Sequence, residues 1–210
     1  YRRLKIKVAP DAPAAQVHAV RSAIGPDIAL QADANGSFTL ADTALLATFD
    51  AARLQCLEQP LPRDALADHA ELARRITTPI CLDESLPSLA AVRDAIELGA
   101  CRVVNVKAGR LGGIDEARRV HDLCMAAGIP VLCGGMLETG IGRAVNVALA
   151  SLPGFTIAGD LSASDRYFAE DLTEPFVLDD GHLRVPPGPG TGVTIQTDVL
   201  ARYTVARERL

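Results

Sequence analysis

The sequence predicts an α/β protein built as a partial (β/α) TIM-type barrel. Short β-branched and apolar runs alternate with amphipathic helical stretches along most of the 210 residues. Such alternation indicates a parallel sheet covered by helices. The runs follow one another at intervals of about 25 residues, close to the length of one βα unit, which favours a barrel over an open doubly wound sheet. No GxGxxG motif follows the first run, which argues against a dinucleotide-binding sheet.

The individual elements follow from these runs and from the capping residues between them. Thr39 and Ser88 are typical N-caps, and the helix predicted after Gly113 has two acidic residues in its first turn. We predict seven strands, at residues 4–9, 28–32, 54–58, 80–83, 102–106, 130–133 and 155–158. We predict six helices between them, at residues 13–24, 40–52, 66–76, 89–98, 114–127 and 141–152.

The last part of the chain does not read as another βα unit. Asp179, Asp180 and Gly181 lie between two short strand-like runs, which predicts a hairpin, and a loop rich in proline and glycine follows. We therefore divide the chain into a partial catalytic barrel at residues 1–165 and a C-terminal hairpin and tail at residues 166–210.

Composition limits the classes of function. The net charge of -5 provides no basic surface, so we expect no nucleic-acid partner. The longest apolar runs are too short for a membrane span, and no signal-like segment opens the chain. The five cysteines are odd in number and form no CxxC pair, which argues against disulfides or a zinc site and favours a cytoplasmic location.

Five charged side chains stand at or near the ends of five consecutive predicted strands. Active sites of parallel barrels lie at the carboxyl ends of the strands. The spacings along the chain are 26, 25, 25 and 24 residues, a regularity that unrelated surface residues would not show. Residues two positions earlier share the same face, including Cys56 and Cys81, which we expect to fill the barrel interior. The five candidates are Lys7, Asp33, Glu58, Asp83 and Lys107.

These residue types predict acid–base chemistry assisted by a metal ion. Three neighbouring carboxylates repel one another unless a cation lies between them, and oxygen ligands of this kind suit Mg²⁺. A bound Mg²⁺ would stabilise the charge that develops when a carbon next to a carboxylate loses its proton. Lys5, two residues before Lys7, would favour the neutral, basic form of that lysine. Lys107 would approach the substrate carbon from the opposite side.

The motifs around these residues resemble those of the enolase superfamily, in its muconate-cycloisomerase-like group. Residues 133–143 and 159–167 resemble the branch of o-succinylbenzoate synthases and N-acylamino acid racemases. The similarity covers essentially the whole chain. The motifs that carry it are Lys5-Ile6-Lys7, Asp33-Ala34-Asn35, Glu58-Gln59-Pro60, Asp83-Glu84-Ser85 and Asn105-Val106-Lys107.

The resemblance implies a role for each site residue. Lys7 and Lys107 would be the acid–base pair, with Lys5 tuning Lys7. Asp33, Glu58 and Asp83 would bind Mg²⁺ or Mn²⁺. A small carboxylate substrate would contact Asn35, Gly135 and Met136.

The activity implied first is that of an o-succinylbenzoate synthase, a lyase of menaquinone biosynthesis. Lys7 would remove the α-proton and assist loss of water, while Lys107 stabilises the enediolate. An N-succinylamino acid or N-acylamino acid racemase, an isomerase with two-base proton transfer, is the alternative, and the site motifs do not separate the two. A dipeptide epimerase fits less well, because residues 159–162 lack the Asp-x-Asp of those enzymes.

The chain also departs from the family pattern. Family members carry an N-terminal α+β capping domain and a first barrel strand, so the seven strands here would correspond to strands 2–8 of the full barrel. We therefore expect a fragment whose residues 166–210 would pack toward the capping domain. A catalytically impaired remnant is the second alternative function, and the full-length form is expected to be a homo-oligomer.

Overall fold

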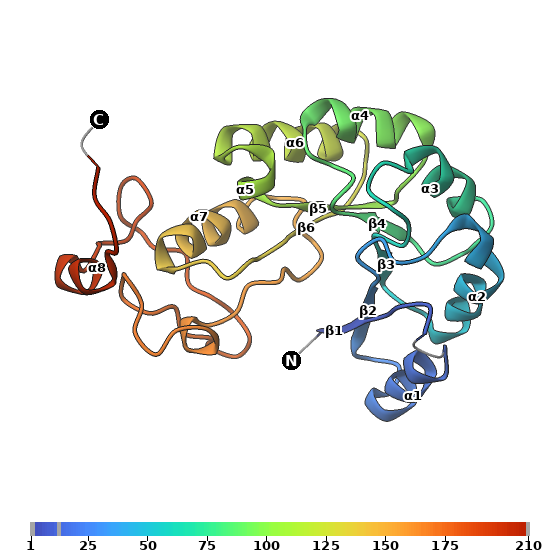
Figure 1. Ribbon diagram of the computed structural model, residues 1–210, viewed down its shortest axis with the longest axis horizontal. Helices are drawn as coiled ribbons and strands as arrows, with labels where there is room; N and C mark the ends of the chain where they lie inside the picture. Colours follow the sequence, from blue (N-terminus) through green and yellow to red (C-terminus); the bar gives the residue numbers. More distant parts are fainter. Residues whose placement is uncertain (1–2, 12–13, 209–210) are drawn as a thin grey trace.

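The computed structural model describes residues 3–11 and 14–208. Within them, one parallel sheet has its strands in chain order and curls into a half-barrel with helices in an arc on its outside (Figure 1). This arrangement confirms the predicted α/β class and partial barrel. The strands are β1 (Arg3–Lys7), β2 (Ala29–Asp33), β3 (Cys56–Glu58), β4 (Ile80–Leu82), β5 (Val103–Val106) and β6 (Val131–Cys133).

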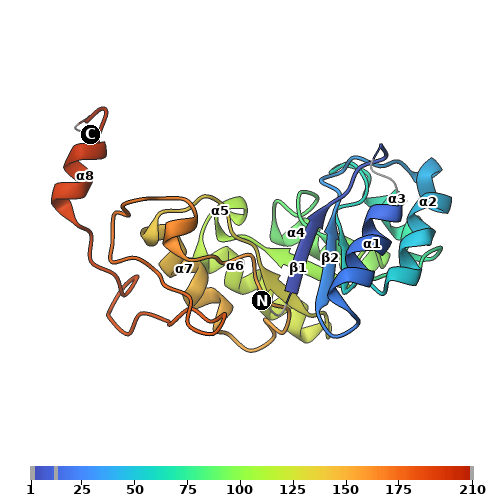
Figure 2. The same cartoon turned by 90° about the horizontal axis from the view of Figure 1, so that it is seen from below.

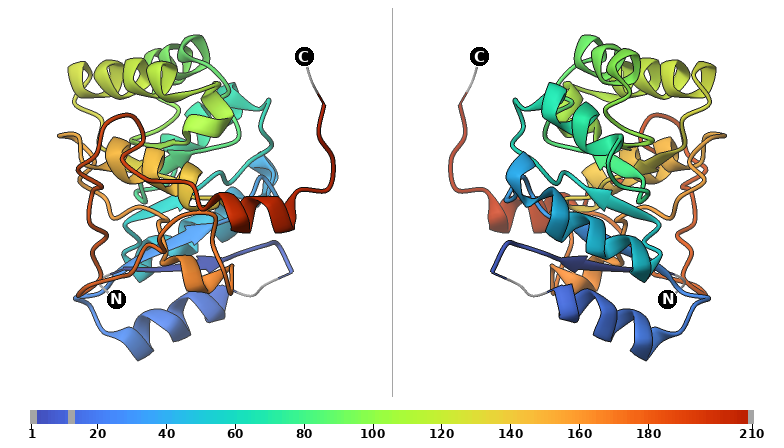
Figure 3. Two further views of the ribbon diagram at one scale, coloured as in Figure 1. Left: turned by 90° about the vertical axis from the view of Figure 1, so that its left-hand side faces the viewer. Right: turned by 90° about the vertical axis from the view of Figure 1, so that its right-hand side faces the viewer.

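The helices follow the order of the strands around the outside of the sheet. Figure 3 shows this order, from the blue α1 at one end to the green α6 at the other. The α-helices are α1 (Ala14–Ile24), α2 (Thr43–Ala47), α3 (Leu66–Ala73), α4 (Leu89–Leu98), α5 (Ala108–Leu111), α6 (Ile114–Ala126), α7 (Gly140–Ala150) and α8 (Thr197–Tyr203). Three 3₁₀ segments accompany them: η1 (Leu40–Asp42), η2 (Thr48–Ala52) and η3 (Ser164–Arg166).

Two apolar layers lie on the two faces of the sheet. The large layer packs the outward side chains of the strands, such as Leu57 and Val104, against the helices. The small layer fills the barrel interior with Cys56, Cys81, Val103, Leu132 and Ile157. The alternation of side chains along each strand therefore places Cys56 and Cys81 inside, as predicted.

All six predicted helical stretches are helical in the structure, but one of them is not a continuous α-helix. Helix α4 has the predicted bounds because the Ser88 hydroxyl accepts a hydrogen bond from Ala91 N (3.3 Å) and Gly99 ends it at φ 68°. The stretch at 40–52 is broken into η1, α2 and η2. Thr43 and Thr48 each donate to the carbonyl three residues earlier (2.6 Å), which competes with regular α-helical bonding. Pro13, the predicted start of the first helix, lies outside the described residues.

The seventh predicted strand, at 155–158, is not a strand in the structure. The segment still runs beside β6, because Val131 N donates to Gly154 O (3.2 Å) and Asp160 N donates to Cys133 O (2.9 Å). Between these points Thr156 N donates to Gly154 O (2.8 Å), so this amide group forms no hydrogen bond with β6. Ile157 nevertheless packs into the barrel interior. The segment thus takes the place of a strand without forming its ladder.

The C-terminal stretch forms the predicted turn but not the strands around it. Asp180 and Gly181 have positive φ (45° and 76°), and Asp179 and His182 exchange two backbone hydrogen bonds of 2.9 Å. The pairing stops at this isolated bridge. Phe176 packs on Ala144 and Val147 of α7. Helix α8, which the sequence did not predict, lies well away from the sheet (Figures 1 and 2).

The described residues contain no helix with the length and hydropathy that a membrane-spanning segment requires.

We expect the five cysteines, all buried and free, to resist thiol reagents in the folded chain. Burial raises the pKa of Cys101, Cys124 and Cys133 to about 12, so little reactive thiolate is present at neutral pH. Ellman's reagent should react slowly with the native chain and fully in concentrated guanidinium chloride. Rapid reaction of a thiol in the native chain would contradict this packing.

Candidate active site

The five predicted site residues lie at the carboxyl edge of the sheet. Lys7 is in register with Asp33, and Asp33 with Glu58. Glu58 is in register with Cys81, so Asp83 lies two residues further along the chain, just beyond the end of β4. Such a stagger is expected when the strands of a barrel tilt against its axis. The sheet therefore sets three carboxylates in a row on adjacent strands.

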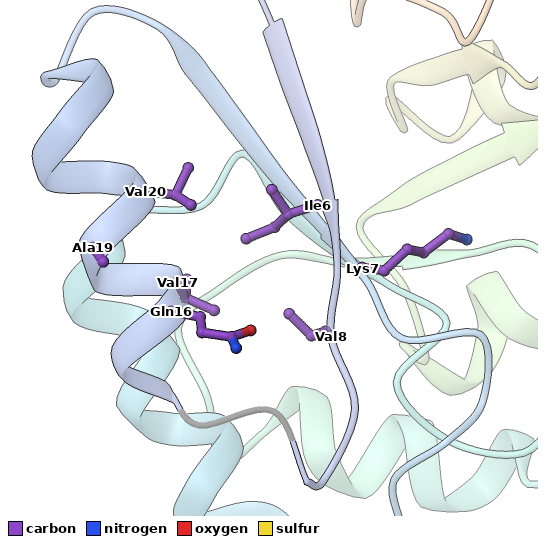
Figure 4. Close-up of a pocket in the computed structure, with 7 residues that line it drawn as sticks. All are labelled: Ile6, Lys7, Val8, Gln16, Val17, Ala19 and Val20. Atoms are coloured by element: carbon purple, nitrogen blue, oxygen red, sulfur yellow. The ribbon is translucent and has the colours of Figure 1, made fainter.

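The side chains of β1 alternate between this row and the helix layer. Figure 4 shows Ile6 and Val8 pointing toward α1, while Lys7 points to the opposite side of the strand. A cavity of about 310 Å³ between β1 and α1 is lined mainly by apolar side chains, including Val17 and Val20. This cavity lies on the helix side of β1, whereas the candidate active site lies on the inner side.

The three carboxylates are buried. The exposed fractions of Asp33, Glu58 and Asp83 are 2%, 0% and 2%. Asn105 Nδ2 donates to Glu58 Oε1 (2.9 Å), and Gln31 Nε2 donates to Glu58 Oε2. Burial raises the pKa of Glu58 to about 7; the Lys5 ammonium lowers it, and the neighbouring Asp33 and Asp83 carboxylates raise it. Burial, more than the neighbouring charges, therefore makes the ionised form of Glu58 costly.

Lysines occupy the two ends of the row, as the sequence predicted. Lys7 Nζ donates to Asp33 Oδ2 (2.7 Å) and also to the Asn35 side chain. Lys107 Nζ donates to Asp83 Oδ2 (2.5 Å). The Lys7 side chain is 69% exposed and that of Lys107 is 19% exposed, so the two ends differ in their access to water.

Lys5 lies at the centre of the charged groups. Its Nζ is 2.8 Å from Glu58 Oε2, 3.1 Å from Asp33 Oδ2 and 2.8 Å from Asp160 Oδ2. Burial alone lowers the pKa of Lys5, but these carboxylates together raise it above its ordinary value. Lys5 therefore keeps its positive charge beside Lys7, which is the arrangement that its predicted tuning role requires.

Two charged residues that directly contact the predicted lysines or carboxylates were not among the predicted site residues. Arg110, on the short helix α5, donates to Asp83 Oδ1 and to Leu86 O (2.9 Å). Asp160 contacts Lys5 and Arg3 from the segment after β6. The only sequence signal for either was its place beside a motif. Strand periodicity assigns a face only to residues on a strand or directly after it, whereas Arg110 lies in a short helix and Asp160 in an irregular segment.

The three predicted substrate contacts fall in two places. Asn35 lies at the Lys7 end, where its Nδ2 donates to Glu84 Oε1 (2.9 Å). Gly135 and Met136 follow β6, and the Met136 side chain is 61% exposed. A Cβ atom on Gly135 would lie 2.0 Å from Asp160 O, so only glycine fits there.

The donor set suits Mg²⁺, although its oxygens are engaged by the protein's own cations. Within the described ranges, no three His, Cys, Asp or Glu side chains already stand close enough to hold a metal ion. The Asp33, Glu58 and Asp83 carboxylates are instead contacted by ammonium and guanidinium groups. Hard, anionic oxygen donors are what Mg²⁺ selects, and the ammonium groups mark where a cation would lie.

A buried guanidinium lies behind the loop that follows β6. Arg143 is 1% exposed, and its side-chain nitrogens find no hydrogen-bond partner among residues 3–11 and 14–208. It forms an ion pair with Glu138 Oε2 at 3.5 Å, and the Tyr167 ring centroid lies 5.9 Å away. Glu138 in turn accepts a hydrogen bond from Met136 N (2.6 Å). The Arg143–Glu138 pair therefore helps to hold the loop that carries Gly135 and Met136.

Comparisons with known proteins identify the family. A family model described as "Enolase C-terminal domain-like" matches residues 1–199. The chain belongs to the enolase superfamily. Among solved structures, an enolase superfamily member from Listeria innocua superposes with a TM-score of 0.94 at 42% identity, over 98% of this chain and 56% of that one. The described residues therefore have the fold of part of the superfamily barrel.

Two curated relatives place the chain within the superfamily. An N-succinylamino acid racemase from an Amycolatopsis species is 57% identical over 207 residues, covering 99% of this chain and 56% of that protein. An o-succinylbenzoate synthase from Geobacillus kaustophilus is 47% identical over 205 residues, covering 97% and 54%. The chain therefore lies in the branch that holds both activities, and it spans just over half the length of these relatives.

Gly134→Ala should disturb the Lys107 end of the row. A Cβ atom there would lie 2.3 Å from Asn105 Oδ1 and 2.5 Å from Lys107 Cε. We expect the free energy of unfolding to fall by about 1–3 kcal/mol, as for other overpacked sites, in urea denaturation. Gly109→Ala is the matched control, because its Cβ meets nothing within 4 Å, and it should not destabilise the chain. Equal effects of the two changes would contradict the close approach.

Glu138→Gln should be costly because it leaves the Arg143 guanidinium buried without a counter-charge. We expect a loss of about 2 kcal/mol in the free energy of unfolding, less than for a fully buried pair because Glu138 is partly exposed. The control is Glu116→Gln, whose partner Arg119 (3.2 Å) is exposed and whose loss should stay below about 0.5 kcal/mol. Thermal and urea unfolding would measure both, and a neutral Glu138→Gln would refute the pairing.

Proposed function

We propose that this chain carries the catalytic site of a Mg²⁺-dependent enzyme that removes a proton next to a carboxylate, in the first place an o-succinylbenzoate synthase. The observation that carries the proposal is the pair of lysines, Lys7 and Lys107, at opposite ends of the buried carboxylate row. The relatives named o-succinylbenzoate synthase, at 43–48% identity, support the choice of reaction. The reaction belongs to menaquinone biosynthesis.

Asp33, Glu58 and Asp83 would hold the Mg²⁺, or Mn²⁺, through their carboxylate oxygens. When bound, the metal supplies positive charge that stabilises the second negative charge developing on the substrate carboxylate. Lys5, whose charge its neighbours maintain, would add to that field from the β1 side. Asn35 and the loop of Gly135 and Met136 would line the pocket for the rest of the substrate.

The two lysines would divide the proton transfers of the dehydration. Lys7 Nζ, in its neutral form, takes the α-proton of the substrate. The same proton then passes to the departing hydroxyl group, which leaves as water and returns Lys7 to its neutral form. Lys107 Nζ, as an ammonium group, stands on the opposite face of the reacting carbon and stabilises its negative charge.

An N-succinylamino acid racemase is the second candidate, favoured by the 57% identity to the Amycolatopsis racemase. Lysines on both faces of one carbon can act in turn. Lys7 would remove the α-proton from one enantiomer while Lys107 delivers a proton to the other face, and the roles reverse for the opposite enantiomer. The same residues serve both reactions, so a single protein could catalyse both.

The remaining features of the proposed enzyme follow from its site and composition. Its partner would be a small carboxylate substrate, and the five free, buried cysteines support a reducing, cytoplasmic location. We place residues 1–165 in the catalytic barrel and infer that residues 166–210 pack toward an N-terminal domain of the full-length, homo-oligomeric protein.

The test is an assay of the gene product that contains this chain. With Mg²⁺ present, ultraviolet absorbance should follow dehydration of the cyclohexadiene precursor to o-succinylbenzoate. Loss of a positioned acid–base group costs about 10²–10⁴ in rate, so Lys107→Ala should lower kcat by at least about 10²-fold. Removing the metal with a chelator should abolish turnover.

A second assay separates the alternatives. Exchange of the α-proton of N-succinylamino acids in deuterium oxide, followed by NMR, would report the racemase reaction. Racemisation without dehydration would favour the racemase, and Mg²⁺ binding without either reaction would indicate an impaired remnant. Turnover that survives in both Lys7→Ala and Lys107→Ala would contradict the proposed roles.

A further inference from the structure

The Lys5 ammonium lies among three carboxylates, of which two are proposed metal ligands. Asp33 and Glu58 would take the metal ion, whereas Asp160 belongs to the segment that follows β6 and is not one of the three proposed ligands. Within the part of the chain that the structure describes, Asp160 is the one carboxylate that contacts Lys5 without being a proposed metal ligand.

A divalent cation and Lys5 would compete for the same oxygen atoms. Lys5 Nζ lies 3.1 Å from Asp33 Oδ2 and 2.8 Å from Glu58 Oε2. Mg²⁺ binds carboxylate oxygens at about 2 Å and repels a neighbouring ammonium group. Binding of the metal therefore requires Lys5 to give up at least part of these two contacts, and a side chain that is only 21% exposed needs another acceptor nearby.

Asp160 is oriented to be that acceptor. Its two carboxylate oxygens have different partners: Arg3 contacts Oδ1, and Lys5 Nζ donates to Oδ2 at 2.8 Å. Arg3 also donates to the carbonyl of Gly159 (3.1 Å), and Asp160 N donates to Cys133 O (2.9 Å). The backbone of Asp160 is thus held by Cys133 and its Oδ1 by Arg3, which leaves Oδ2 facing Lys5.

We propose that Asp160 is a positioning residue that retains the Lys5 ammonium when a divalent cation occupies Asp33 and Glu58. The proposal rests on the metal site proposed above. Asp160 then contributes to metal binding without being a ligand. Because it accepts a hydrogen bond from Lys5, the carboxylates of Asp33 and Glu58 are freed from Lys5 and can bind the metal. Lys5 then remains beside Lys7 as a fixed positive charge instead of swinging into water.

The experiment is a titration of the gene product with Mg²⁺ alone, by isothermal calorimetry, in a double-mutant cycle. Asp160→Asn, which can still accept a hydrogen bond from Arg3, should weaken Mg²⁺ binding at least about tenfold, the loss expected for one charge-assisted hydrogen bond. In the Lys5→Met background the same change should have little effect, because no ammonium remains to compete. Asp165→Asn, an exposed carboxylate of η3, is the matched control and should leave the Kd unchanged.

Each result decides one point. Equal losses of affinity in both backgrounds would show a general charge effect and overturn the inference, as would an unchanged Kd for Asp160→Asn. Circular dichroism of the metal-free variants checks their folding. Should Asp160→Asn unfold, Asp160→Ser takes its place in the cycle with the same expected result. Absence of Mg²⁺ binding by the unmodified protein would instead overturn the proposed metal site, and the inference with it.

Discussion

Three carboxylates buried side by side are the constraint on which the rest of the site depends. A buried charge is costly unless an opposite charge and hydrogen bonds accompany it, and Asp33, Glu58 and Asp83 are almost fully buried. The protein places cationic groups around them, with Lys5 at the centre and other lysines at the ends. Because the same lysines are the proposed catalytic groups, the balance of charge and the chemistry of the site are set together.

The parallel sheet brings these groups together. Strands that run in one direction end at one edge, so side chains about 25 residues apart in the chain become neighbours in space. The interior layer beneath them is apolar and buried, and includes Cys56, Cys81 and Leu132. Glycine at position 134 lets the backbone after β6 pass directly against Lys107. Packing therefore fixes the positions of the charged groups.

The Arg3–Asp160–Lys5 cluster connects the two ends of the half-barrel. Asp160 is separated from Lys5 by 155 residues, yet it shares the ammonium group with the carboxylates of β2 and β3. The contact ties the segment after β6 to β1, and within residues 3–11 and 14–208 no strand ladder joins them. One ion-pair cluster thus contributes both to the closure of the fold and to the electrostatics of the candidate site.

The sequence by itself determined the repeating βα order, the strand-end positions of Lys7, Asp33, Glu58, Asp83 and Lys107, and the Asp-Gly turn, because these depend on local periodicity and turn chemistry. The tertiary structure decided which groups neutralise one another. Arg110 and Asp160 act from a short helix and an irregular segment, where no periodicity assigns a face. Whether residues 155–158 form a strand also depended on their hydrogen-bond partners. Thr156 N donates to Gly154 O instead of to β6, so the predicted strand does not form. Contacts between residues distant in the chain depend on how all the elements pack, and a local pattern does not contain that information.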